Sequence, residues 1–209
     1  MKIFEVTPPA NNDEQQIVVA IKSGKTIANI ENNLKKLNWT LLSFGNFGRV
    51  FTKSNVPYVI KISQQEDVGY EKFVSIVHTY PNKHFPKISK DIIVNSFYVY
   101  FIEKLHPMSN DILKGEMCDY CSMIDLKYVK SGYNEQKAKI SAFEKTHKSL
   151  AEALEILSSI VEEDENGTLR LDLDNFNNIM QRKDGTPVII DPFVDRMVFS
   201  AEEDWDEDS

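Results

Sequence analysis

Short apolar runs separated by turn residues occupy the first half of the chain and predict a strand-rich region. The predicted strands cover residues 17–21, 41–44, 49–52, 58–62, 91–95 and 97–102. Between the first two, apolar residues recur at helical spacing over 27–37, which predicts a helix that ends before Trp39. A second amphipathic helix is indicated by residues 70–77 and is stopped by Pro81.

Helical periodicity dominates the second half of the chain. Residues 116–128 have the pattern of a helix, and a longer helix is predicted over 134–162. The buried stripe of the longer helix consists of Ile140, Phe143, Leu150, Leu154, Leu157 and Val161. The segment 165–168, E-N-G-T, ends this helix, and one hairpin follows. The chain is therefore predicted to be α+β, with a strand-rich part followed by a helical part.

Composition and charge narrow the class of protein. With 209 residues, 42% hydrophobic and 27% charged, the chain can bury a core as one domain or as a small two-lobed one. The net charge of −8 argues against nucleic acid as the main partner, because phosphates repel an acidic surface. No apolar run suits a membrane and no signal-peptide core begins the chain, so a cytoplasmic location is expected. The acidic segment 201–209 is expected to be solvated, with partner docking or autoinhibition as the alternative.

Cys118 and Cys121 form a C-x-x-C spacing inside the predicted helix 116–128. No second pair accompanies them, and the four histidines of the chain leave a zinc site short of ligands. The two thiols are therefore expected to pack into the core, with a redox pair as the alternative.

Candidate chemistry is concentrated around the hairpin of the second half. The Asp-Gly pair at 184–185 is a strong turn signal between the segments 178–182 and 187–190. If these segments pair, Asn178 and Asp191 fall at the same end of the hairpin. An amide oxygen and a carboxylate suit a hard cation such as Mg²⁺, which prefers oxygen ligands and keeps positions for phosphates. Taken alone, the two residues could instead cap a strand and a turn.

A glycine-containing turn in the first half is the second candidate. The sequence SFGNFGRV, residues 43–50, places Gly45 and Gly48 between two predicted strands. Glycines let backbone amides approach phosphate oxygens closely, although a plain hairpin has the same pattern. Lys61, in the next strand, is either a surface lysine with its stem along the sheet or a point charge for the same phosphates.

Taken in order, these features resemble the signature series of the protein kinases. SFGNFGRV is similar to the glycine-rich loop, YVIK to the strand with the phosphate-binding lysine, LDLDNFNNIM to the catalytic loop and IIDPF to the D-F-G motif. Asp191 follows Asn178 by thirteen residues, which is similar to the family's spacing between its two metal ligands. The endings NIM, DGTP and DP, at 178–180, 184–187 and 191–192, resemble in particular the small early-expressed serine/threonine kinases of lytic bacteriophages.

The resemblance covers residues 41–193 and implies a two-lobed, protein-kinase-like fold. Residues 1–105 would form an N-terminal extension and a β-rich lobe with one main helix. Residues 106–209 would form a reduced helical lobe with the catalytic hairpin and the acidic tail. Such an enzyme binds ATP and Mg²⁺ and transfers the γ-phosphate of ATP to hydroxyl groups of proteins.

The family's nucleotide-binding roles carry over to individual positions. The loop residues that would cover the phosphates are Ser43, Gly45, Phe47, Gly48 and Val50. Lys61 would hold the α- and β-phosphates of ATP. A carboxylate on the following helix would orient this lysine: Glu71 is preferred, with Glu66 and Asp67 as alternatives.

The remaining roles concern the metal, the transferred proton and adenine. Asn178 and Asp191 would bind Mg²⁺, and Asp172 would accept or orient the proton of the incoming hydroxyl. Glu103 and Leu105 fall where the family's hinge meets adenine through backbone groups.

One departure from the family pattern lies in the catalytic loop, where H-R-D reads R-L-D. Asp172 precedes Asn178 by six residues and Asp174 precedes it by four, whereas the family's spacing is five. Either the loop carries one inserted residue, or Asn177 is the metal ligand. The spacing to Asp191 favours Asn178, and Asp172 is preferred to Asp174 as the base.

Other departures concern regulation and substrate recognition. Ser43 replaces the first glycine of the loop and places a phosphorylatable hydroxyl near the phosphates. Asp-Pro-Phe replaces Asp-Phe-Gly, so the flip that switches many kinases is not expected. Because sixteen residues follow Phe193, the family's large peptide-binding subdomain is expected to be missing.

Three functions compete at this point. The preferred one is a minimal serine/threonine kinase, a phage early protein that acts on host proteins. The second is a kinase-like phosphotransferase for small molecules, but such enzymes usually have more helix after the metal ligands than is expected here. A pseudokinase, which binds partners without phosphotransfer, has no physical need to keep Lys61, Asp172, Asn178 and Asp191 together.

Overall fold

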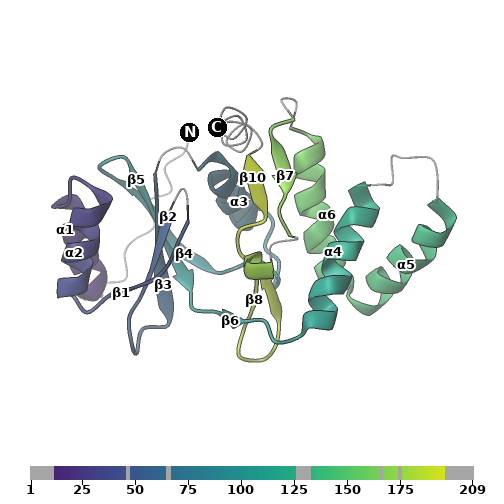
Figure 1. The fold of residues 1–209 in the computed structure, drawn as a ribbon, viewed down its shortest axis with the longest axis horizontal. Coiled ribbons are helices and arrows are strands. Elements are labelled where there is room, and N and C mark those ends of the chain that lie inside the picture. Colours follow the sequence, from purple (N-terminus) through teal and green to yellow (C-terminus); the bar gives the residue numbers. More distant parts are fainter. Residues whose placement is uncertain are drawn as a thin grey trace, which may run out of the picture. The chain divides into compact units, whose positions relative to one another are not determined.

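The computed structural model describes residues 12–45, 48–64, 67–125, 133–164, 167–173 and 176–195. They form an α+β protein, whose helices and strands are labelled in Figure 1. The chain divides into two compact units, Met1–Asp67 with Lys87–Lys104 and Val68–Pro86 with Leu105–Ser209. We call the first the sheet unit and the second the helical unit. Within the described ranges, no helix has the length and apolarity needed to cross a membrane.

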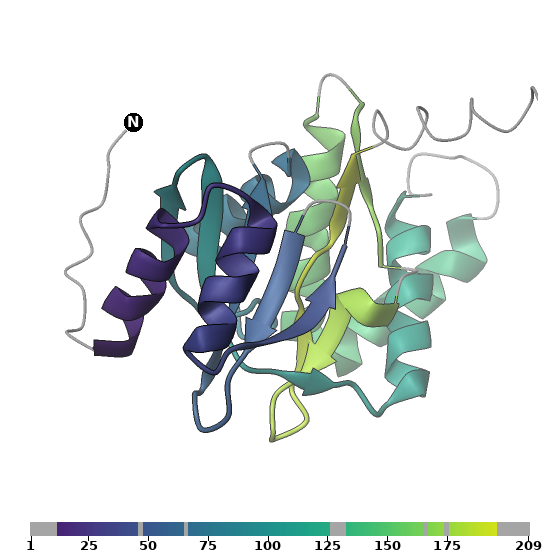
Figure 2. The same ribbon diagram turned by 60° about the vertical axis from the view of Figure 1, so that its left-hand side comes forward.

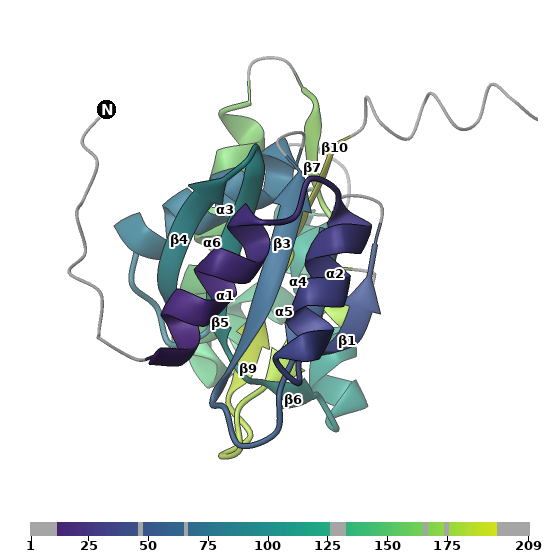
Figure 3. The same cartoon turned by 90° about the vertical axis from the view of Figure 1, so that its left-hand side faces the viewer.

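A five-stranded antiparallel sheet forms the centre of the sheet unit. In spatial order its strands are β1 (Thr40–Phe44), β2 (Gly48–Thr52), β3 (Tyr58–Gln64), β5 (Phe97–Glu103) and β4 (Ile88–Val94). Two helices, α1 (Asn12–Lys22) and α2 (Ile27–Lys36), cover one face of the sheet (Figure 2 and Figure 3). The strands predicted over 41–44, 49–52, 58–62, 91–95 and 97–102 are confirmed.

Buried apolar side chains from the helices and the strands form one core in the sheet unit. Ile21 and Leu34 of the helices share a fully buried cluster with Phe51, Ile60 and Phe101 of the strands. Because such burial removes apolar area from water, it is the main source of stability for this unit.

The run at 17–21, predicted as a strand, lies inside α1, so that prediction is wrong. Ile17 and Ile21 are one helical turn apart and both buried, whereas Val19 between them is 65% exposed. This is the burial pattern of a helix with one apolar face. A run of only five apolar residues is too short to reveal its period, which explains the error.

Four helices and two small sheets make up the described part of the helical unit. The helices are α3 (Val68–Thr79), α4 (Asp111–Asp125), α5 (Tyr133–Thr146) and α6 (Lys148–Glu162). One sheet contains β6 (His106–Pro107), β8 (Ile179–Gln181) and β9 (Pro187–Ile189), and the other contains β10 (Phe193–Asp195) and β7 (Leu169–Leu171). A short 3-10 helix, η2 (Phe176–Asn178), leads into β8. The helices α4, α5 and α6 pack on one another (Figure 1).

Three predicted helices have counterparts in the structure. Those over 27–37 and 70–77 are confirmed as α2 and α3, and the one over 116–128 corresponds to α4. Residues 126–128 lie outside the described part of the chain. At the start of α2, the hydroxyl of Thr26 accepts a hydrogen bond from the amide of Asn29 (3.2 Å), which caps the helix.

The single helix predicted over 134–162 is wrong, because two helices, α5 and α6, meet at His147. The backbone of His147 leaves the helical region, with φ −126° and ψ 43°. Apolar packing continues on both sides of the break: Phe143 stacks on Tyr120 with 4.5 Å between ring centroids, and Leu150 is buried. An apolar stripe that continues through a one-residue break cannot reveal that break in the sequence.

Candidate functional site

The turn of the β8–β9 hairpin is closed by residues that favour tight turns. The carboxylate of Asp184 accepts a hydrogen bond from the amide of Thr186 (2.9 Å), and this bond lowers the pKa of Asp184. Gly185 adopts φ +83°, a left-handed conformation that side chains disfavour. The Asp-Gly signal therefore builds the turn, and Asp184 is structural.

Asn178 and Asp191 come to the same end of this hairpin, as predicted. Ile179 pairs with Ile189, and the amide of Ile190 donates to the carbonyl of Asn178 (2.9 Å). Asp191 follows directly. The strand register thus places the two candidate metal ligands beside each other in the fold.

Asp172 reaches the same place through a different pairing. The strands β7 and β10 align Leu171 with Phe193, and the amide of Asp172 donates to the carbonyl of Pro192 (2.8 Å). The side-chain amide of Asn178 donates to Oδ2 of Asp172 (3.1 Å) and to its carbonyl oxygen (2.8 Å). Two independent strand pairs therefore assemble one group of polar residues.

The structure distinguishes between the alternatives in this loop only in part. Asn178 contacts Asp172, whereas Asn177 is exposed, so the geometry favours Asn178 over Asn177 as the ligand. Asp174, the other candidate base, lies outside the described residues.

The group has the donor chemistry that Mg²⁺ requires. Because the amide nitrogen of Asn178 faces Asp172, its oxygen Oδ1 is directed elsewhere and is suited to a hard cation. Asp191 adds a half-buried carboxylate. Among the residues that the structure describes, no three or more His, Cys, Asp or Glu side chains gather as a metal cage. Asn178 and Asp191 could supply two oxygen ligands to such an ion, and waters and phosphates would complete its shell.

Aromatic packing anchors the strand that follows Asp191. Phe193 is buried and its ring meets that of Phe73 of α3 edge-on, with 6.5 Å between centroids. A Cβ atom added at Gly69 would lie 3.3 Å from Cβ of Phe193, which is tighter than most contacts of real side chains. The glycine therefore permits α3 to approach β10 closely. This contact fixes the backbone just after Asp191, the candidate metal ligand.

A cysteine from α4 contacts the same loop. The thiol of Cys118 donates to the carbonyl of Leu173 (3.1 Å), and Cys121 is buried. Neither thiol forms a disulfide, and they pack as predicted, with Cys121 buried and Cys118 half-buried.

In the sheet unit, the glycine-containing turn joins β1 to β2. Ser43 pairs with Val50, and the amide of Gly45 donates to the carbonyl of Gly48 (2.9 Å). A side chain at Gly45 would meet open space, so no packing demands a glycine there. Phe47, predicted at the tip, lies outside the described residues.

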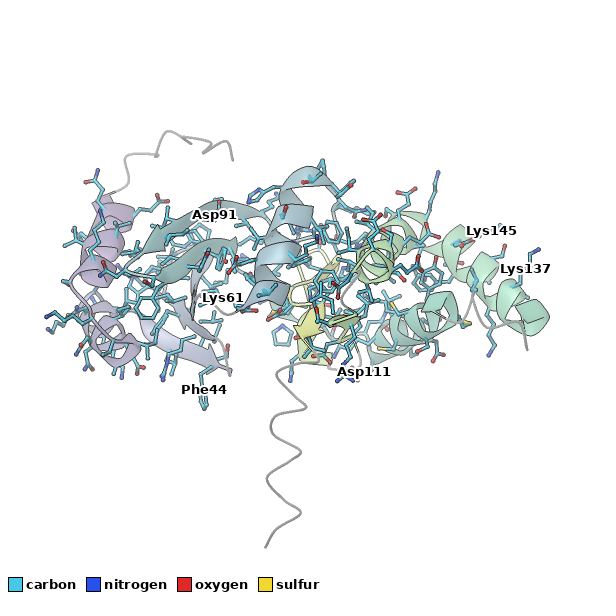
Figure 4. The ribbon with its side chains drawn as sticks, turned by 90° about the horizontal axis from the view of Figure 1, so that it is seen from above. Phe44, Lys61, Asp91, Asp111, Lys137 and Lys145 are labelled. Carbon is cyan, nitrogen blue, oxygen red and sulfur yellow. The ribbon has the colours of Figure 1, made fainter. Side chains whose placement is uncertain are left out.

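Gly48 lies against the stem of Lys61. A Cβ atom at Gly48 would come within 3.0 Å of the carbonyl oxygen of Ile62 and 3.5 Å of Cε of Lys61. The missing side chain leaves space for the lysine, which lies on β3 and is only 8% exposed (Figure 4). Lys61 is thus a buried charge and not a surface lysine.

A carboxylate of the sheet unit compensates the charge of Lys61. Nζ of Lys61 lies 3.5 Å from Oδ2 of Asp67, and the hydroxyl of Ser63 donates to the same oxygen (3.4 Å). Asp67 is one of the alternatives to Glu71 that the sequence offers as the partner of Lys61. No sequence pattern indicates the role of Ser63. Glu71, in the first turn of α3, belongs to the helical unit, and Glu66 lies outside the described residues.

The predicted adenine-contacting residues lie at the end of β5 and beyond it. The amide of Glu103 donates to the carbonyl of Lys87 (2.9 Å), and its carboxylate accepts from the amide of Lys87 (2.8 Å). Glu103 is therefore engaged within the sheet. Leu105 is half-buried and begins the next segment of the helical unit.

A scan against protein-family models and a search of curated proteins each found no match to this chain.

Proposed function

We propose that this chain is a minimal, two-lobed, protein-kinase-like phosphotransferase. It would use ATP and Mg²⁺ to phosphorylate serine and threonine hydroxyls of host proteins, as an early protein of a bacteriophage. The observation that carries this proposal is the convergence of Asp172, Asn178 and Asp191 in the helical unit through two separate strand pairings. A structural role alone does not explain why one base candidate and two oxygen ligands meet there.

Within this proposal, each residue of the helical unit has a distinct task. The bond from Asn178 holds Oδ2 of Asp172, which leaves Oδ1 to accept the proton of the substrate hydroxyl. Asn178 and Asp191 would hold Mg²⁺, which neutralises charge on the transferred phosphoryl group. The fixed aspartate thus orients the hydroxyl for attack.

The sheet unit supports the same proposal through its buried lysine. Lys61 is held between Gly48 and Asp67, where the carboxylate of Asp67 offsets the cost of burying its charge. A lysine in this setting would bind the α- and β-phosphates of ATP, and the backbone of the 43–50 turn would cover them.

The test is phosphate transfer from labelled ATP to proteins of a bacterial lysate in the presence of Mg²⁺. We expect Asp172→Asn and Asp191→Asn each to reduce labelling by at least about a hundredfold, because general-base and metal functions are removed. Asp111→Asn is the matched control, since Asp111 begins α4 and its side chain is 89% exposed (Figure 4). Its labelling should equal that of the unchanged chain.

Two results would overturn the proposal in favour of its alternatives. ATP binding without any transfer would indicate a pseudokinase. Label found only on small molecules of the lysate would indicate a small-molecule phosphotransferase. Transfer that survives Asp172→Asn but needs Asp191 would instead move the base to another residue, with Asp174 the next candidate.

A further inference from the structure

The helical unit contains a pocket of about 550 Å³ whose lining shares no residue with the candidate metal site. Four lining residues carry basic nitrogens, Lys83, His84, His147 and Lys148, and Glu152 is the acidic residue among them. Hydroxyl groups of Thr146, Ser149 and Thr186 also line it. This composition contrasts with the chain as a whole, whose net charge is −8.

His84 is one of the lining residues of this pocket and is buried, with 5% of its surface exposed. Its Nδ1 lies 2.8 Å from the carbonyl oxygen of Pro187, which can only accept, so Nδ1 carries the proton. Its Nε2 therefore accepts a hydrogen bond from the hydroxyl of Ser149 (3.0 Å). Desolvation, followed by the charges of nearby basic residues, lowers the pKa of His84 and keeps it neutral.

Hydrogen bonds tie the walls of the pocket together. The guanidinium group of Arg182 donates to the carbonyls of Lys83 and Phe85. From the same segment, the side-chain amide of Asn82 donates to the carbonyl of Ser149 (3.0 Å) at the start of α6. The basic side chains are therefore carried on a backbone that is already in place, which lowers the entropy cost of binding a ligand.

With two lysines and one glutamate, the lining of the pocket keeps a net positive charge. Among the described residues, Lys83 and Lys148 form no ion pair, whereas Nε2 of His147 lies 3.6 Å from Oε2 of Glu116. The first turn of α6 contains no acidic residue, and His147 caps it with no side-chain hydrogen bond. The partial positive charge of this helix end adds to that of the two lysines.

We propose that this pocket binds a phosphate dianion, either free or as a monoester on another molecule. The ammonium groups of Lys83 and Lys148 form the charged donor set of the pocket: they make no ion pair among the described residues, and together they match the two charges of the dianion. A carboxylate carries one charge and offers fewer acceptors, so it fits this set less well. The site acts independently of the proposed phosphotransfer.

Calorimetric titration of the full chain at low ionic strength tests the proposal. Inorganic phosphate is one ligand, and a short peptide with one phosphoserine, beside its unphosphorylated form, is the other. We expect phosphate-dependent binding, weakened about tenfold by Lys83→Met or by Lys148→Met because each removes one charge-assisted contact. The double variant should lose binding by about a hundredfold if the two contacts act independently.

Lys137→Met is the matched control, because it removes the same charge from α5 at a residue outside the pocket lining (Figure 4). This variant should bind phosphate within about twofold of the unchanged chain, as expected for a distant, screened charge. Stronger binding of the phosphopeptide than of free phosphate would identify a monoester as the ligand, and equal binding would identify the free ion. Absence of binding, or equal weakening by all three single variants, would overturn the proposal. Asp191→Asn should leave this binding unchanged, which separates the result from any failure of phosphotransfer.

Discussion

The sheet unit and the helical unit hold their functional residues in place by different means. In the sheet unit, β3 and β5 pair over seven successive positions, and Lys61 lies in the middle of this ladder. In the helical unit, the strands that carry the candidate site are two or three residues long. Such strands have little stability alone, and side-chain hydrogen bonds secure them. Apolar burial therefore places the lysine, whereas specific polar contacts place the aspartates and asparagine.

The largest expected effect tests the apolar side of this comparison. Phe51 on β2 is fully buried in the core, and we expect Phe51→Ala to lower the free energy of unfolding by about 3–5 kcal/mol, because a cavity replaces the ring. Phe44→Ala on β1 is the control, since Phe44 is 76% exposed (Figure 4). Urea denaturation followed by circular dichroism measures both. Equal, small losses would mean that the core does not determine the stability of this unit.

A smaller loss is expected from the polar contacts of the hairpin. Arg182 donates to two carbonyl groups, those of Lys83 and Phe85. Arg182→Met leaves both without a charged donor and should lower the free energy of unfolding by about 2 kcal/mol. Lys183→Met, at the exposed neighbouring position, should change it by less than about 0.5 kcal/mol. A loss at Arg182 as large as that at Phe51 would remove the distinction between the units.

The start of β7 depends on a single carboxylate oxygen. Oδ2 of Asp164 accepts from the amide of Thr168 (2.6 Å), its hydroxyl (3.0 Å) and the amide of Leu169 (2.8 Å). Asp164→Ala should therefore cost about 1–2 kcal/mol and speed amide exchange in β7, which precedes Asp172. Asp164→Asn keeps an acceptor oxygen and should lose less. Unchanged exchange in both variants would show that β7 needs no such anchor.

The smallest expected effect concerns pH. Burial, with nearby positive charge, lowers the pKa of His84, so the folded state holds this histidine neutral. Its contribution to stability should be complete above about pH 6.5, the ordinary pKa of histidine, and decline as pH falls through the lowered pKa, because the unfolded chain binds the proton first. This contribution can be measured by comparing the denaturation of the unchanged chain with that of His84→Gln between about pH 7.5 and about pH 5, a range that spans the ordinary pKa of histidine. If the stability of His84→Gln depends on pH as steeply as that of the unchanged chain, another group causes the effect.

Much of the candidate site could be predicted from local sequence patterns. The Asp-Gly turn determines which residues end the hairpin, so the meeting of Asn178 and Asp191 follows from the register. The contact between Asp172 and Asn178 could not be predicted in this way, because it depends on β10 pairing with β7 across more than twenty residues of sequence. The choice among carboxylates for Lys61 could not be made from the sequence, since Glu66, Asp67 and Glu71 all follow the same strand within a few residues. Only the fold brings the carboxylate of Asp67 to Lys61 and to the hydroxyl of Ser63.

By itself, the sequence determined the features that depend on near neighbours: the strands of the sheet, the amphipathic helices α2 and α3, and the hairpin turn at Asp184. Periodicity and turn chemistry act over a few residues, so they can be recognised locally. The tertiary structure decided that the run at 17–21 is helical, that α5 and α6 separate at His147, and that four basic residues from two distant segments line one pocket. Each of these depends on which surfaces the chain buries against one another, and that information is distributed over contacts between residues far apart in the sequence.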